Sequence, residues 1–183
     1  MMKNIFKLRK LRCSDLIMEL KITEKKIFKF LGVVFYGKPF HTHEPWSEKN
    51  EIGNTWNRYI KLYKKYKEFL DSIRAGDEVG FEIHIEPQDY DKDRKFDIFV
   101  GLEVINFDYF PIEFYSKILP KTEYLFFNTE YKSSETEWVF REWLPESDYT
   151  QSYPYIMQTY SPKRWEENNL MDWYIPIKKK EES

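Results

Sequence analysis

The sequence contains little cysteine and no excess of charge of either sign. Its single cysteine, Cys13, allows neither an intramolecular disulfide nor a thiolate metal cluster, which agrees with a reducing compartment. The 29 basic and 31 acidic residues nearly cancel to a formal net charge of −2, so no overall field attracts nucleic acid or an anionic membrane. We therefore expect no direct binding to nucleic acid and no association with a membrane.

Long apolar runs and the common catalytic motifs are also missing. No apolar run approaches the ~20 residues of a membrane helix, and the N-terminal residues lack the apolar segment of a signal peptide, so we expect a soluble, cytoplasmic protein. The sequence has no glycine-rich phosphate loop, nucleophile elbow or Cys–His pair, which argues against kinases, nucleotide-binding proteins and serine hydrolases. His41 and His43 have a spacing found in metal ligands, but no third strong ligand is evident nearby. We expect neither a metal nor a cofactor.

Aromatic residues are abundant instead. The 183 residues include 15 Phe, 14 Tyr and 6 Trp, more rings than packing alone usually requires, which indicates a pocket or an interface. This length corresponds to one domain or to two small halves that share a core. We expect residues 1–20, with their short basic cluster, to form a tail, and residues 179–183 to form a charged C-terminal tail.

The first half, about residues 21–106, begins with a strand and a helix. β-branched and aromatic residues predict a strand over about 26–36. After an irregular loop, apolar residues recur at helical spacing, so we expect a helix that begins after Thr55 as its N-cap and stops before Gly76.

Alternating residues then predict a hairpin, with strands at 79–87 and 96–104. In the first of these strands we expect the apolar face, with Phe81 and Ile83, to point to the core. We expect the polar face of that strand, which carries His84, to be solvated.

The second half, about residues 107–178, repeats this order. We expect a strand at 122–131, a helix from Ser134 to Pro145, and two further strands in the segments YIMQTYSP and LMDWYIPIK. The chain is therefore predicted to be an α+β protein of two duplicated strand-helix-strand-strand units, with an antiparallel sheet and two main helices.

The two hairpins superpose at an offset of 75 residues, because Pro-to-Asp spacing is the same in both. This offset pairs Ile83 with Gln158, so we expect Gln158 to point inward between Ile156 and Tyr160. An unpaired buried amide costs about 1 to 3 kcal/mol. Gln158 should therefore either form a buried hydrogen bond within the protein or provide a polar contact at the base of a ligand pocket.

The hairpin FEIHIEPQDYDKDRKFDIFVGLEV, the segment REWLPESDY and the ending DWYIPIK resemble the GyrI-like small-molecule-binding domain, also known as the AraC-type effector-binding domain. The segment IGNTWNRY is similar to its stand-alone and integron-associated branch. The resemblance covers about residues 21–178. It implies a pseudo-twofold pair of units with a ligand cleft between them, lined by aromatic residues and an acidic one.

The resemblance also implies several functions. Such domains act as sensor modules in transcription regulators or stand alone as gyrase-inhibitor and toxin-resistance proteins, and some stand-alone relatives hydrolyse cyclopropane-bearing DNA-alkylating compounds. Members often carry a glutamate in a Glu-x-Tyr pattern, where this chain has Gln158-Thr159-Tyr160. Because that negative charge is missing, we expect a small apolar or aromatic ligand that is neutral, unless Glu103, Glu82 or Asp172 replaces the carboxylate.

Strand faces, the helix start and the resemblance together suggest the following ligand contacts: Trp56, Tyr59, Glu103, Trp143, Gln158, Tyr160 and Trp173. Ordinary core packing is the alternative for each ring, and a solvated strand position is the alternative for Glu103. Ligand binding that passes a signal to a protein partner is the first functional hypothesis. The second is a hydrolase in which Glu103 or His84 directs water and Tyr160 donates a proton to the leaving group. The third is a gyrase-inhibitor-like module that binds a protein.

Overall fold

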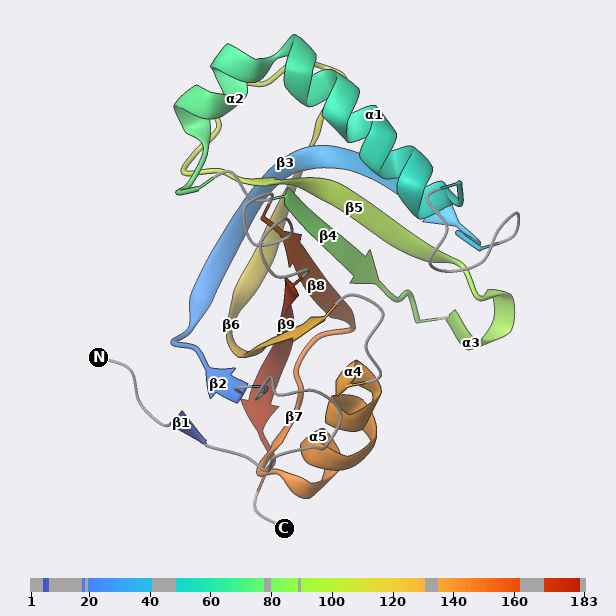
Figure 1. Ribbon diagram of the computed structural model, residues 1–183, viewed down its shortest axis with the longest axis vertical. Helices are drawn as coiled ribbons and strands as arrows, with labels where there is room; N and C mark the ends of the chain where they lie inside the picture. Colours follow the sequence, from blue (N-terminus) through green and yellow to red (C-terminus); the bar gives the residue numbers. More distant parts are fainter. Residues whose placement is uncertain are drawn as a thin grey trace. The chain divides into compact units, whose positions relative to one another are not determined.

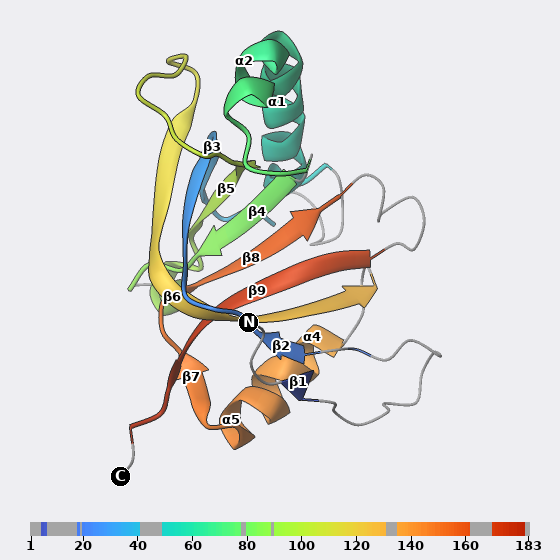
Figure 2. The same cartoon turned by 90° about the vertical axis from the view of Figure 1, so that its left-hand side faces the viewer.

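The computed structural model describes residues 5–6, 18, 20–40, 49–77, 80–88, 90–130, 135–161 and 170–181. The chain divides into two compact units (Figures 1 and 2): unit 1 consists of residues 1–26 and 120–183, and unit 2 of residues 27–119. The border that we expected near residue 106 lies inside unit 2. Each unit combines antiparallel strands with helices, which confirms the predicted α+β class. No helix in the described ranges is long and apolar enough to cross a membrane.

Unit 2 is a sheet with helices along one face. Its elements are β3 (Lys26–Gly37), α1 (Glu51–Lys65), α2 (Lys67–Ile73), β4 (Gly80–Ile85), α3 (Tyr90–Asp93) and β5 (Phe96–Glu103). Strand β5 lies between β3 and β4 and pairs antiparallel with both. Figure 1 shows α1 and α2 lying over one face of these strands. All three strands lie where the sequence predicts them, β3 from its β-branched and aromatic residues and β4 and β5 from their alternation.

The core of unit 2 lies between this sheet face and the helices. Leu31 of β3 and Val100 and Leu102 of β5 are buried there against Tyr59 of α1 and Leu70 of α2. The contributing positions of each strand are two residues apart, as the alternation of side chains along a strand requires.

The opposite face of the same sheet carries buried phenylalanines. Phe30 lies 4.9 Å from Phe81 and 6.1 Å from Phe99 between ring centroids. Gly32 and Gly101 face each other in the ladder, and a methyl group on either would come within 2.8 Å of the Phe99 ring. Glycine at both positions therefore lets that ring lie flat on the sheet.

Helix α1 begins earlier than the sequence indicates. Its N-cap is Asn50, whose Oδ1 accepts a hydrogen bond from the Gly53 backbone N–H at 3.0 Å. The Thr55 hydroxyl instead donates to the Glu51 carbonyl within the helix at 2.6 Å. The prediction of Thr55 as N-cap was therefore wrong. The helical path is interrupted at Tyr66, between α1 and α2.

Unit 1 also has an antiparallel sheet region. Its elements are β1 (Ile5–Phe6), β2 (Leu20–Ile22), β6 (Tyr115–Glu130), α4 (Glu135–Trp138), a π-helical segment η1 (Val139–Trp143), α5 (Leu144–Glu146), β7 (Tyr149–Gln151), β8 (Tyr155–Tyr160) and β9 (Leu170–Lys179). Strand β9 lies between β6 and β8, and its last residues also pair with β7 (Figure 2). The first residues of β6 belong to unit 2.

The core of unit 1 packs one face of this sheet against its helices. Phe127 of β6 and Trp173 and Ile175 of β9 are buried there with Val139 of η1. The helical segment ends at Glu146, so Pro145 lies inside it and not at its end as expected. The expected N-cap Ser134 lies outside the described residues.

Candidate functional site

A buried carboxylate lies between β4 and α1 in unit 2. Glu82 of β4 is only 4% exposed. The Trp56 Nε1–H of α1 donates to Glu82 Oε2 at 2.5 Å, and His84 Nε2 lies 2.6 Å from Glu82 Oε1. A buried carboxylate requires such partners, because an unpaired charge away from water is strongly unfavourable. Trp56, Glu82 and His84 are termed the carboxylate cluster below.

The strand register places this cluster under the helix. Glu82 is opposite Val100 and His84 is opposite Ile98, and both apolar partners pack in the helix-covered core. The expectation of a solvated polar face on β4 was therefore wrong. The alternation identified the two faces of the strand correctly, but both faces are buried, and α1 covers the polar one.

A glycine makes room for the tryptophan of this cluster. Gly80 precedes Glu82 on the same face of β4, and a Cβ atom there would lie 2.6 Å from the Trp56 ring. The indole therefore rests against the backbone of β4, with Tyr59 at 6.0 Å in an edge-to-face arrangement. This contact was not predicted, although a glycine at the start of an alternating strand is a signal of close approach.

The proposed catalytic residues of unit 2 do not lie together. His84 has a carboxylate within hydrogen-bond distance, an arrangement that orients an imidazole for acid–base chemistry. Glu103 is opposite Phe30 in the ladder, so its side chain lies on the phenylalanine-bearing face. His84 and Glu103 are thus on opposite faces of one sheet.

Unit 1 contains a buried amide. Gln158 of β8 is 6% exposed, so its side chain is buried as the sequence predicts. The Tyr160 hydroxyl donates to Gln158 Oε1 at 2.7 Å. Within the described ranges, the Gln158 Nε2 amide makes no hydrogen bond. Gln158, Tyr160 and Trp173, which is directly opposite Gln158, are termed the amide cluster.

The tryptophans of unit 1 belong to its core. Trp173 is stacked parallel to Phe127, and its Nε1–H donates to Thr129 Oγ1 at 3.0 Å. Trp143 of η1 is half-buried against the same core. The structure therefore places Gln158 beside Trp173 and Tyr160 in one unit, and Trp56 beside Tyr59 in the other.

The equivalence of Ile83 and Gln158 was wrong. Ile83 is opposite Phe99, on the face of unit 2 turned away from its helices, whereas Gln158 is opposite Trp173 on the helix-covered face of unit 1. The two hairpins pair in registers that differ by one residue, because equal loop spacing does not fix register. Gln158, like Glu82, therefore lies on the face of its strand that the helices of its unit cover.

The structure provides little support for a metal site. Among the described residues, no group of three His, Cys, Asp or Glu side chains is placed to hold a metal ion. His41 and His43 lie outside the described residues.

Several solved structures are similar to this chain. The structure of SAV2435 bound to tetraphenylphosphonium matches with a TM-score of 0.58 and 12% identity over 89% of this chain and 94% of that one. The crystal structure of the EcmrR C-terminal domain matches with a TM-score of 0.54 and 13% identity over 89% and 98%. A Vibrio cholerae integron cassette protein matches with a TM-score of 0.50 and 14% identity over 87% and 95%. These identities are low, so the likeness concerns the fold.

The sequence profile of one protein family covers most of the chain. The profile of the integron-associated effector binding protein matches residues 21–177. No curated protein is significantly similar to the chain in sequence. The chain therefore belongs to the family of integron-associated effector binding proteins, which is a GyrI-like family.

Proposed function

We propose that the protein binds a small, largely apolar and uncharged organic molecule, and that the amide cluster of unit 1 contacts it. The observation that carries this proposal is the Gln158 Nε2 amide, a donor on a nearly buried residue without an acceptor in the described ranges. Covering this donor with a ligand that offers no acceptor would cost about 1 to 3 kcal/mol. A carbonyl or ether oxygen of a ligand would satisfy it.

The chemistry of the amide cluster favours neutral ligands. Gln158 has no charge, and its Oε1 is occupied by the Tyr160 hydroxyl, which fixes the orientation of the amide. Rings near such a donor suit flat apolar ligands. The SAV2435 structure holds tetraphenylphosphonium, a bulky aromatic ion, which supports an aromatic ligand for this chain as well.

Residues of unit 2 also remain candidate ligand contacts from the sequence. These are Trp56 and Tyr59, whereas both Glu82 oxygens already have partners within unit 2. Trp143 and Glu103 remain candidate contacts from the sequence. A protein partner that receives the signal and a cytoplasmic location also remain predictions.

The test is tryptophan fluorescence quenching by a panel of neutral aromatic compounds, followed by titration of the best binder. Gln158→Leu should raise its Kd about tenfold, because the ligand acceptor loses its hydrogen bond to the amide. Gln88→Leu, a change at an exposed glutamine of unit 2, is the matched control and should leave the Kd unchanged. Equal Kd values for the wild type and Gln158→Leu would contradict the assignment of the amide cluster.

Hydrolysis is the second candidate function. The 2.6 Å contact between His84 and Glu82 favours it, because a carboxylate can orient an imidazole as a general base. Mass spectrometry of the ligand recovered after long incubation separates the two functions. Unchanged ligand at full recovery indicates binding alone, whereas a product that disappears in His84→Gln supports turnover.

A further inference from the structure

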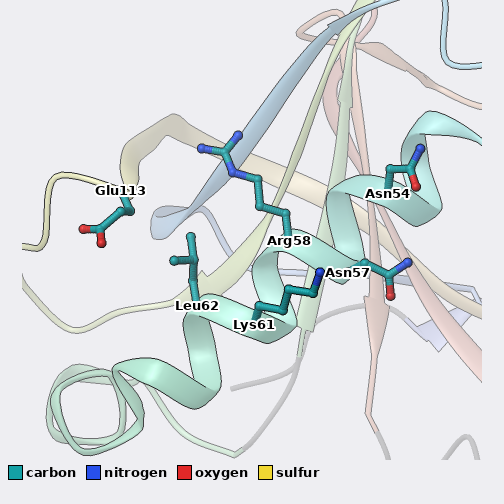
Figure 3. A pocket seen from close by; sticks show the side chains of 6 residues that line it. All are labelled: Asn54, Asn57, Arg58, Lys61, Leu62 and Glu113. Atoms are coloured by element: carbon teal, nitrogen blue, oxygen red, sulfur yellow. The ribbon is translucent and has the colours of Figure 1, made fainter.

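A hollow lies on the outer side of α1 in unit 2, along a stripe of the helix that does not include Trp56 or Tyr59. Its volume is about 620 Å³. Figure 3 shows five lining side chains on α1 and one on the segment between β5 and β6: Asn54, Asn57, Arg58, Lys61, Leu62 and Glu113. The five helical positions are spaced by three and four residues, so they form one stripe along the helix.

The basic side chains of the hollow have no counterion among the residues that the structure describes. Arg58 and Lys61 are exposed, and neither side chain forms an ion pair or a hydrogen bond with the residues that the structure describes. The Asn57 side chain likewise makes no hydrogen bond within those ranges. Two cations and an amide donor therefore lie along one stripe with their hydrogen-bonding capacity unused by the protein.

The acidic residue of the hollow does not neutralise these cations. The Glu113 carboxylate accepts hydrogen bonds from Lys65 Nζ and from the Tyr66 hydroxyl, both at 2.7 Å. Its negative charge is therefore already matched by Lys65. The remaining charge of the lining is positive, and it comes from Arg58 and Lys61.

We propose that this hollow binds a small organic anion, a molecule that carries a phosphate or carboxylate group on an apolar body. Arginine and lysine donate charge-assisted hydrogen bonds to both kinds of anionic group. Leu62 provides an apolar surface for the rest of the molecule. The volume lies in the range of small-molecule sites, about 300 to 1,000 Å³.

This hollow shares no residue with the amide cluster. The amide cluster lies in unit 1 and is neutral, whereas the hollow lies in unit 2 and is basic. The proposal therefore does not depend on the proposed function, and the two can fail independently. Because the hollow is open to solvent, binding should weaken as salt is added.

The test uses phenyl phosphate as the probe and the full chain labelled with ¹⁵N. Titration followed by NMR should shift the backbone amides of residues 54–62 in the wild-type protein. The double variant Arg58→Gln/Lys61→Gln should raise the Kd about tenfold or more, because it removes both charged donors. Both positions are exposed, so the fold should be retained, and the unperturbed remainder of the spectrum checks this directly.

Lys64→Gln is the matched control, because Lys64 is an exposed lysine of the same helix that does not line the hollow. It should change the Kd less than about twofold. An equal loss of affinity in Lys64→Gln and in the double variant would show nonspecific attraction and overturn the site. Shifts confined to residues other than 54–62 and Glu113 would also overturn it. Binding of a hexaglutamate peptide there without binding of phenyl phosphate would replace the small anion with an acidic protein segment.

Discussion

Glu82 and Gln158 are both polar residues of short strands, and both are buried on faces covered by helices. Each has a tyrosine, tryptophan or histidine side chain as its hydrogen-bond partner. The Glu82 carboxylate has partners on both oxygens, whereas the Gln158 amide has one on its oxygen only. This difference is the reason why we propose Gln158, and not Glu82, as the donor to a ligand.

Gly80→Ala tests the packing of the carboxylate cluster. The new methyl group would lie 2.6 Å from the Trp56 ring, so the ring must move and its hydrogen bond to Glu82 must lengthen. Chemical denaturation should show a loss of about 1 to 3 kcal/mol in the free energy of unfolding. In a Trp56→Phe background the same change should cost less, because the clashing ring atoms are gone. Equal costs in both backgrounds would show that the two residues do not touch.

Some of these residue contacts can be read from the sequence and others cannot. The burial of Gln158 was predicted from its pairing with Ile83, and the burial is confirmed although that pairing is wrong. The residue opposite Gln158 in the ladder could not be predicted from the sequence. Either Trp173 or its neighbour Tyr174 could lie there, and a register shift of one residue moves a side chain to the other face of the sheet. For Glu82, the alternation predicted a solvent-exposed side chain. That prediction was wrong because alternation does not show which face of a strand a helix covers.

At the scale of elements, α1 carries different residues on its two sides. Its inner side carries Trp56 and Tyr59, and its outer side carries Arg58 and Lys61. The strands of unit 2 follow from their alternation and β-branched residues. The start of α1 does not, because Asn50 follows a segment rich in polar residues that resembles an irregular loop. The π-helical turn in η1 has no recognisable sequence signal.

Asn50→Ala tests the observed start of α1. The change removes the acceptor for the Gly53 N–H and should lower the free energy of unfolding by about 1 kcal/mol, as N-cap substitutions do. Thr55→Val removes only a hydroxyl that bonds within the helix and should cost less. Thermal denaturation of both variants shows which one loses more stability. A larger loss of stability for Thr55→Val than for Asn50→Ala would support the N-cap predicted from the sequence.

At the scale of the whole molecule, the repeated order of strands and helices is visible in the sequence and is confirmed in both units. The hollow on α1 was not predicted, because the sequence does not reveal that Glu113 lies beside residues more than 50 positions earlier in the chain. Long-range proximity of this kind depends on tertiary packing. The same holds for the ion pair between Lys65 and Glu113.

That ion pair should make stability depend on pH. The hydrogen bonds from Lys65 and from Tyr66 lower the pKa of Glu113 from 4.5 to about 2. A carboxyl whose pKa is lowered by folding adds stability above the ordinary value, and this is lost as the pH falls toward the folded value. The stability difference between wild type and Glu113→Gln should therefore be constant above about pH 5 and shrink between about pH 4.5 and 2.

Urea denaturation at several pH values measures this difference. Glu142→Gln is the control, because the Glu142 side chain is exposed and makes no hydrogen bond or ion pair with the described residues. It should change stability little at any pH. A difference for Glu113→Gln that stays the same down to about pH 2 would contradict the assigned pKa shift.

The most direct test of the central claim is the Kd of tetraphenylphosphonium for the Gln158→Glu variant. If Gln158 contacts the ligand, the new carboxylate should attract this cation and tighten binding roughly tenfold relative to the wild type. Gln88→Glu adds the same charge at an exposed position and should leave the Kd nearly unchanged. A Gln158→Glu protein that is folded and binds the cation no better than Gln88→Glu would contradict a ligand site at the amide cluster.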